Sequence, residues 1–176
     1  MSKLRRRERL EKLFVNHAGA VRAYALRRID PATAEETVSE VFMIAWRRLD
    51  DVPSDPLPWL LACARRVLAN QRRAGRRRVA LQERLSQAGD VPDAWEFDGV
   101  GDRSLARALG ELSGDDRELL LLAAWEELEP EQTALALGCS RRTLAVRLHR
   151  ARRRLADSLQ RIEHEEPSIT TMESLR

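Results

Sequence analysis

The stretch that decides the fold of this chain is PEQTALALGCSRRTLAVRLHRARRR, residues 130–154. Pro130 suits the first position of a short helix, and Gly138 favours the left-handed backbone that ends helices. Ser140 then suits the N-cap of a longer helix that runs from residue 141 to about residue 162. A short helix, a three-residue turn containing glycine and a longer basic helix together predict a helix-turn-helix.

The longer helix has two chemically different faces. Its apolar residues recur at helical spacing and are predicted to pack inward: Leu144, Leu148, Ala151 and Leu155. On the outer face arginine can read guanine in the major groove, and small apolar side chains can pack near thymine methyl groups. An ordinary helical hairpin with a solvated face is the alternative, but the glycine turn, the serine cap and the lack of outward acids favour DNA. The residues predicted to face outward are Arg142, Ala145, Val146, His149, Arg150 and Arg153.

Charge is distributed unevenly along the chain. Residues 141–154 hold seven arginines and no acid, and residues 65–84 hold eight arginines and one acid. Residues 85–131 hold thirteen acids against three arginines, so two basic blocks flank an acidic middle although the net charge is only +3. Solvated helix faces explain most charge runs. Crowded arginines without acids repel one another, however, and a polyanionic partner would relieve that repulsion.

Composition sets the class of protein. A length of 176 residues suits one or two small domains, and 43% hydrophobic residues are enough for modest cores. No run of about eighteen apolar residues exists, so no membrane insertion is expected. No apolar signal segment follows the basic N-terminus, and the two cysteines are far apart, so we expect a cytoplasmic protein without a disulfide scaffold. Ala, Leu, Arg and Glu dominate over β-branched residues, which predicts an all-α fold.

The first helices are marked by clear boundary signals. Apolar residues at helical spacing predict one helix over residues 5–28 and another over residues 31–49. Asp30 suits the N-cap of the second helix, and Pro31 suits its first position.

A loop and a third helix follow. Residues 50–58 hold three prolines and three aspartates, which predicts a loop. The third helix is expected to start at Trp59 and to end near Gly75, and residues 76–87 are compatible with a further short basic helix. Trp46 and Trp59 flank the loop, where they could stack on single-stranded bases. Burial in the core is the commoner role of such tryptophans, and we favour it.

The chain is predicted to form two small helical domains joined by a flexible acidic linker. The linker sequence AGDVPDAWEFDGVGD, residues 88–102, is rich in glycine and aspartate and lacks periodicity. Trp95 and Phe97 within it either dock on a partner or fold back on a domain, and the sequence favours neither. Ser113 suits the N-cap of a helix in the second domain. The expected segments are a first domain over residues 1–87, the linker over 88–103, a second domain over 104–162 and a flexible tail over 163–176.

Several segments resemble bacterial extracytoplasmic-function sigma factors. AEETVSEVFMIAWRRL (residues 34–49) resembles the helix that grips RNA polymerase in that family, and PWLLACARRVLANQRRAGRRR (residues 58–78) resembles its promoter −10 helix. HAGAVRAYALRRI (residues 17–29) resembles the preceding helix. ALALGCSRRTLAVRLHRARRRL (residues 134–155) resembles the second half of the family's domain four. The resemblance covers roughly residues 10–160 in the family's order.

The resemblance implies a factor without enzymatic activity, metal or other cofactor. Its implied partners are core RNA polymerase, through the β′ clamp helices and the β flap, promoter DNA and an anti-sigma factor. The implied polymerase-binding residues are Glu35, Glu36, Ser39, Glu40 and Met43. The implied −10 residues are Ser54, Asp55, Leu57, Trp59, Arg65, Arg66, Arg72, Arg73 and Arg76. The implied −35 residues are Arg141, Arg142, Thr143, Val146, Arg147, His149, Arg150 and Arg153.

The chain also departs from the family at a few positions. Members often carry Asn and Asp where this chain has Arg66 and Asn70, and they prefer Ile at the positions of Thr133 and Cys139. Gln132 replaces a usual Glu. These changes concern promoter preference rather than architecture.

Two rival classes remain. A stand-alone helix-turn-helix regulator needs its own dimerisation element and effector pocket, and the sequence shows neither. An enzyme needs a cluster of ligating or nucleophilic residues, but the three histidines are scattered and no glycine-rich phosphate loop exists.

Overall fold

A computed structural model describes residues 3–85 and 103–165, with side chains for residues 3–75 and 103–164. These residues form α-helices and one short 3-10 helix, and no strand occurs within the described ranges. The all-α prediction is therefore confirmed. The chain divides into two compact units, one on each side of the segment 86–102. The predicted linker, with Trp95 and Phe97, falls almost entirely on that segment and lies outside the described residues.

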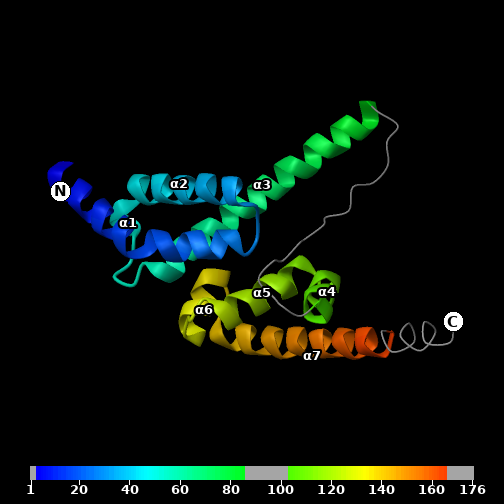
Figure 1. Cartoon of the computed structure of the whole chain (residues 1–176). Helices are drawn as coiled ribbons and strands as arrows, with labels where there is room; N and C mark the ends of the chain where they lie inside the picture. Colours follow the sequence, from blue (N-terminus) through cyan, green and yellow to red (C-terminus); the bar gives the residue numbers. More distant parts are fainter. Residues whose placement is uncertain (1–2, 86–102, 166–176) are drawn as a thin grey trace. The chain divides into compact units, whose positions relative to one another are not determined.

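The first unit is built from three helices that contact one another (Figure 1). They are α1 (Lys3–Leu26), α2 (Pro31–Arg47) and α3 (Leu57–Leu85), with the 3-10 helix η1 (Leu49–Asp51) after α2. The core takes apolar side chains from every one of these elements. Its fully buried members include Val21, Tyr24, Val41, Leu49, Leu60 and Leu61.

The start of α2 follows the capping signals of the sequence. The Asp30 carboxylate accepts a hydrogen bond from the Thr33 backbone N–H at 3.0 Å, and Pro31 occupies the first turn. The Thr33 hydroxyl donates a second hydrogen bond to this carboxylate at 2.7 Å. The hydroxyl bond first, and the backbone bond after it, lower the pKa of Asp30. The predicted N-cap is confirmed.

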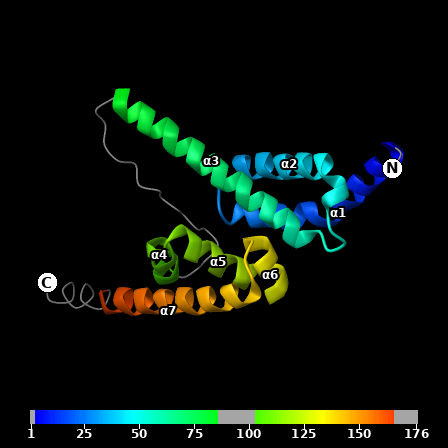
Figure 2. The same ribbon diagram turned by 180° about the vertical axis from the view of Figure 1, so that it is seen from behind.

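Helix α3 does not end near Gly75 as the sequence analysis predicted. It continues without a break to Leu85, so the separate basic helix expected over residues 76–87 is its own last turns, which extend past α1 and α2 (Figures 1 and 2). A single glycine costs a helix only about 1 kcal/mol relative to alanine. No proline follows Gly75, and good helix formers lie on both sides, so the helix continues.

The second unit consists of three short helices and one long helix. They are α4 (Arg103–Glu111), α5 (Gly114–Trp125), α6 (Pro130–Leu137) and α7 (Arg141–Glu165). Each short helix contacts α7, which runs along the whole unit (Figure 2). Helix α7 ends a few residues beyond the predicted end at residue 162, and residues 166–176 of the predicted tail lie outside the described part. The core includes Leu119, Leu122, Leu144, Ala151 and Ile162.

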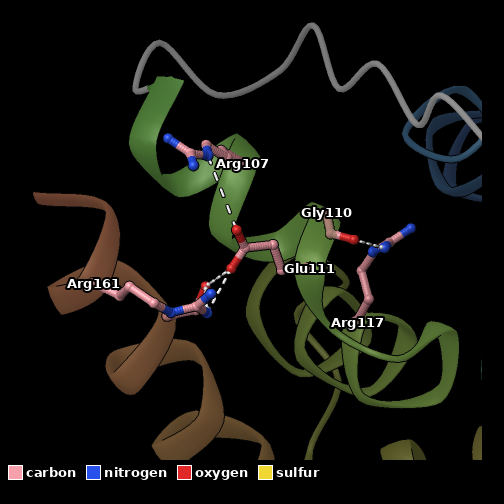
Figure 3. A network of polar contacts seen from close by, with 6 residues as sticks. Arg107, Gly110, Glu111, Arg117 and Arg161 are labelled. Atoms are coloured by element: carbon pink, nitrogen blue, oxygen red, sulfur yellow. Dashed lines mark hydrogen bonds and ion pairs between the residues drawn. The ribbon is translucent and has the colours of Figure 1, made fainter. Parts of the chain in front are cut away.

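Polar contacts at the end of α4 fix it to its neighbours (Figure 3). Glu111 accepts a hydrogen bond from the Ser158 hydroxyl at 2.5 Å and pairs with Arg161 at 2.8 Å, which joins α4 to α7. Arg117 of α5 donates to the carbonyl oxygens of Leu109 and Gly110 at 2.7 and 2.6 Å. These carbonyls belong to the last turn of α4, where a helix leaves them without an intrahelical partner.

Candidate nucleic-acid and polymerase interfaces

The helix-turn-helix has the predicted geometry. Gly138 adopts the left-handed conformation at φ 68°, and its N–H bonds back to the end of α6. Ser140 caps α7 by accepting a hydrogen bond from the Thr143 N–H at 3.1 Å. A non-glycine residue at position 138 would be strained, so the turn that aims α7 depends on this glycine.

The outer face of α7 is exposed as the sequence predicted. Leu144 and Ala151 are buried, and Leu148 and Leu155 are half-buried, which fixes the orientation of the helix. Val146 has an exposed fraction of 46%, and Arg147 is half-buried. The other predicted −35 residues are all exposed: Arg141, Arg142, Thr143, His149, Arg150 and Arg153.

The seven arginines of residues 141–154 fall into two groups. The two at the ends make ion pairs, Arg141 with Glu131 at 2.7 Å and Arg154 with Asp116 at 2.5 Å. The five between them have no hydrogen bond or ion pair with any residue that the structure describes. Arginines without such partners, four of them exposed and Arg147 half-buried, suit the phosphates and base edges of a DNA duplex. The five are Arg142, Arg147, Arg150, Arg152 and Arg153.

The Arg154–Asp116 pair was not predicted. Asp116 lies in the first turn of α5, its side chain is only 12% exposed, and its carboxylate contacts Arg154, 38 residues further along the chain. No local pattern signals such a pair. Arg154 therefore differs from its neighbour Arg153, because it stabilises the fold of the unit.

The predicted −10 residues of the first unit lie in and after the loop between η1 and α3. Ser54 and Asp55 are exposed, and Leu57 and Trp59 in the first turn of α3 are half-buried. Buried Val52 and Pro58 hold the two ends of the loop on the core. The loop thus presents short polar side chains between two fixed points.

The arginines of α3 continue away from the loop. Arg65 is half-buried, and Arg66 is exposed. Arg72 donates to the Arg28 carbonyl oxygen at 3.3 Å, and Arg73 donates to the Asn70 side chain at 2.8 Å. The Arg76 side chain lies outside the described residues.

The preference for core positions at both tryptophans was wrong for Trp46. Its side chain is 41% exposed, and the Arg6 guanidinium lies 5.4 Å from the centre of its ring. Trp59 is half-buried. Val41, Phe42 and Ala45 occupy the buried face of α2, which turns Trp46 toward the N-terminal part of α1.

The five predicted polymerase-binding residues line one shallow groove of about 580 Å³ on α2. Met43 is 52% exposed, and Glu35 pairs with Arg22 of α1. The groove therefore combines an apolar side chain with a predominantly acidic rim. Its lining consists of Glu35, Glu36, Ser39, Glu40, Met43, Ile44 and Arg47.

A second, more apolar groove of about 890 Å³ lies between α1 and α2 and was missed by the sequence analysis. The signal for it was available, because Met43 and Trp46 lie outside the apolar stripe that α2 buries. Met43 and Ser39 line both grooves. The full lining is Lys3, Arg6, Arg7, Leu10, Ser39, Phe42, Met43 and Trp46.

The two cysteines are free thiols. Burial raises the pKa of the Cys63 thiol, although the charge of nearby Arg66 opposes this effect. Cys139 is half-buried at the helix-turn-helix turn. In the described ranges, no three His, Cys, Asp or Glu side chains lie close enough to hold a metal ion, and no helix is long and apolar enough to cross a membrane.

Comparison with known proteins gives consistent matches for both units. The family model for Sigma-70 region 2 matches residues 13–78, and that for Sigma-70 region 4 matches residues 102–155. The ECF RNA polymerase sigma factor SigL of Mycobacterium tuberculosis is 32% identical over 162 residues, which cover 87% of this chain and 90% of SigL. The RNA polymerase sigma-E factor of Streptomyces avermitilis is 32% identical over 135 residues, covering 74% of this chain and 73% of that protein.

Solved structures share the fold. The sigma factor RpoE of Bartonella quintana, crystallised with the anti-sigma factor NepR, matches with a TM-score of 0.59 and 24% identity over 85% of this chain and 96% of that one. CnrH, in complex with the cytosolic domain of CnrY, matches with a TM-score of 0.56 and 24% identity, over 86% and 87% of the two chains.

Proposed function

The chain belongs to the extracytoplasmic-function family of RNA polymerase sigma factors, which bind core RNA polymerase and direct promoter-specific initiation, and we propose that it does so through three surfaces. The observation that carries the proposal is the row of five arginines on α7 without partners among the described residues. The corresponding domains are residues 1–87 and 104–162, joined by the predicted linker over 88–103; of the predicted linker and tail, residue 103 belongs to α4 and residues 163–165 belong to α7.

The first surface is the outer face of α7, which reads the −35 element in the major groove. Arg150 and His149 reach base edges, since both side chains are exposed on α7 outside the buried stripe of Leu144 and Ala151. Arg142, Arg147 and Arg153 hold phosphates, and Val146 packs against the duplex. Arg141 must exchange its ion pair with Glu131 before it can contact a phosphate.

The second surface is the loop before α3, which captures a base from the melted −10 strand. Removing a base from the stack costs a few kcal/mol, so the loop must supply contacts that offset this cost. Ser54 and Asp55 offer polar groups, and Trp59 offers part of a ring for stacking. The arginines along α3 then hold the backbone of the strand.

The third surface is the acidic groove on α2, which binds the β′ clamp helices of the polymerase. Exposed Met43 supplies apolar contact, and Glu36 and Glu40 supply charge for basic residues of the partner. The second unit binds the β flap. An anti-sigma factor is a further partner, and the protein works in the cytoplasm without catalysis of its own.

Charge reversal tests the polymerase surface. The variant Glu36→Lys/Glu40→Lys should bind core RNA polymerase at least tenfold more weakly, since each reversal replaces attraction by repulsion. The matched control is Glu8→Lys/Glu163→Lys, which makes the same charge change at exposed acids outside the groove. Affinity for core is measured by fluorescence anisotropy, and the melting temperature is measured alongside. Equal affinities of the two variants for core would exclude the groove as the polymerase-binding surface. Failure of the unaltered chain to bind core would overturn the proposed function.

A further inference from the structure

The segment that leads into the −10 loop receives hydrogen bonds from a distant part of the chain. Helix α2 ends at Arg47, η1 follows, and the loop begins at Val52. Leu49 and Val52 are buried, whereas Asp50 and Asp51 point to solvent. The two apolar residues fix the depth of the segment, and the N–H groups of Asp51 and Val52 bond to carbonyl oxygens within it.

Two arginines of α1 bind oxygen atoms at the end of α2 and in the segment that follows it. Arg6 pairs with the Asp50 carboxylate at 2.7 Å and donates to the Trp46 carbonyl oxygen at 3.1 Å. Arg9 donates to the Val52 carbonyl oxygen at 2.9 Å. Both side chains are only partly exposed, and the Arg6 guanidinium also lies over the Trp46 ring.

The chemistry of these contacts suits arginine. The carbonyl groups of the last helical turn have no intrahelical donor, and Trp46 lies in that turn. The planar guanidinium of Arg6 serves a carboxylate and this carbonyl at once, which the point charge of lysine cannot do in the same geometry. Residues 6 and 9 are three apart on one helix, so they present their side chains on the same face.

We propose that Arg6 and Arg9 are positioning residues for −10 recognition, which hold the start of the loop at Trp46, Asp50 and Val52. They touch no base themselves. By fixing the backbone at Val52 they set the direction in which Ser54 and Asp55 leave the core. This inference rests on the proposed role of the loop as the −10 reader.

The test is the discrimination of the holoenzyme between −10 sequences. Open-complex formation is measured on a cognate promoter and on single-base −10 variants, with unaltered chain, Arg6→Ala and Arg9→Ala. Each alanine variant should lose discrimination by roughly tenfold, the scale of one lost hydrogen bond to a charged group. Arg9→Lys should retain most of it, because a lysine can still donate to the Val52 carbonyl oxygen. Arg6→Lys should not, because it cannot replace both contacts of Arg6.

Arg7→Ala is the matched control. It removes the same charge from the same helix, but Arg7 pairs with Glu11 one turn away and contacts nothing in the loop segment. The inference would be overturned if Arg6→Ala and Arg9→Ala discriminated between −10 sequences as well as Arg7→Ala does. An equal loss of activity on every promoter accompanied by a lower melting temperature, which is the mark of a merely structural role, would also overturn it.

A variant with a scrambled loop distinguishes the role of the loop from the role of Arg6 and Arg9. If scrambling residues 54–57 leaves −10 preference unchanged, the proposed function of the loop fails. If scrambling changes the preference and the two alanine variants do not, only the role of Arg6 and Arg9 fails.

Discussion

Helices α3 and α7 both carry an arginine-rich segment, but the two segments differ in what their arginines contact. On α3, Arg72 and Arg73 donate to oxygen atoms of their own unit. On α7, the five arginines between Arg141 and Arg154 have no such bond with any described residue. A ligand of Arg72 or Arg73 must therefore displace internal hydrogen bonds, whereas a ligand of the five α7 arginines meets guanidinium groups without partners among the described residues.

The difference follows from the packing of each helix. The apolar stripe of α7 lies against three short helices, and Arg142, Arg150, Arg152 and Arg153 are exposed outside it. Arg72 of α3 lies close to the segment that follows α1, where the carbonyl oxygen of Arg28 accepts its hydrogen bond. Duplex readout calls for a rigid preformed surface, and capture of a single strand allows contacts to be exchanged.

The largest expected effect comes from breaking the orientation of α7. Leu144→Ala should lower the free energy of unfolding of the second unit by about 2–5 kcal/mol, because Leu144 is buried. Val146→Ala, two residues away and largely exposed, should change it by less than about 0.5 kcal/mol. Chemical denaturation of both variants measures the contrast. Similar losses would show that the inward and outward faces are assigned wrongly.

The next effect separates base readout from phosphate contact on α7. Arg150→Ala should cost about 1–3 kcal/mol of affinity for the matched −35 duplex and relax preference at one base. Arg153→Ala should weaken all duplexes alike and reduce the slope of affinity against salt by about one. Fluorescence anisotropy on matched and mutated duplexes over a salt series measures both. If the two variants behave identically on every sequence, α7 reads no bases.

Substitution of Arg154 tests the difference between the paired and the unpaired arginines of α7. Its replacement by alanine leaves the nearly buried Asp116 carboxylate without its cation, which should cost about 1–2 kcal/mol of stability after solvent screening of the exposed arginine. Arg153→Ala should leave the melting temperature unchanged. Thermal unfolding followed by circular dichroism compares the two, and equal melting temperatures would argue against the ion pair.

Continuity of α3 at Gly75 is tested by a stabilising substitution. Gly75→Ala should raise the free energy of unfolding by about 0.5–1 kcal/mol, because the added Cβ meets no atom of the described part of the chain within 4 Å and alanine favours helix. A helix that ended at this glycine would gain nothing. Denaturant unfolding of the first unit decides between the two, with Gly110→Ala in α4 as a control with comparable space.

The smallest effect concerns acid sensitivity in the second unit. The hydrogen bond from Ser158, reinforced by Arg161 and Arg107, lowers the pKa of Glu111 below its ordinary 4.5. A lowered pKa stabilises the fold above pH 4.5, and this stabilisation is lost as the pH falls through the pKa of the folded state. Glu111→Gln should therefore flatten the loss of stability on acidification. A melting-temperature profile as steep as that of the unaltered chain would contradict this.

Local signals predicted most of the fold, and their limits are instructive. Asp30, Gly138 and Ser140 mark helix ends through hydrogen bonds within a few residues, so the sequence alone reveals them. Gly75 was misinterpreted because one glycine is a weak signal against strong neighbours. The α7 face was predictable because one helix carries both its stripe and its arginines.

Contacts between segments that are distant in the sequence could not be predicted from it. The Asp116–Arg154 pair spans 38 residues, and the Arg6–Asp50 and Arg9–Val52 contacts span 44 and 43. Each depends on which helix faces overlap after packing. The local sequence around an arginine in a basic helix does not distinguish an ion pair within the chain from a contact with the phosphate of a partner.

The most direct test of the account is run-off transcription by core RNA polymerase on a library of promoters randomised at the −35 and −10 elements. With the unaltered chain, transcripts should come from promoters that share both elements, and Arg150→Ala should change the selected −35 sequence alone. Scrambling residues 54–57 should change the selected −10 sequence alone. Transcripts with no shared elements, or none beyond those made by core polymerase without the chain, would contradict the account.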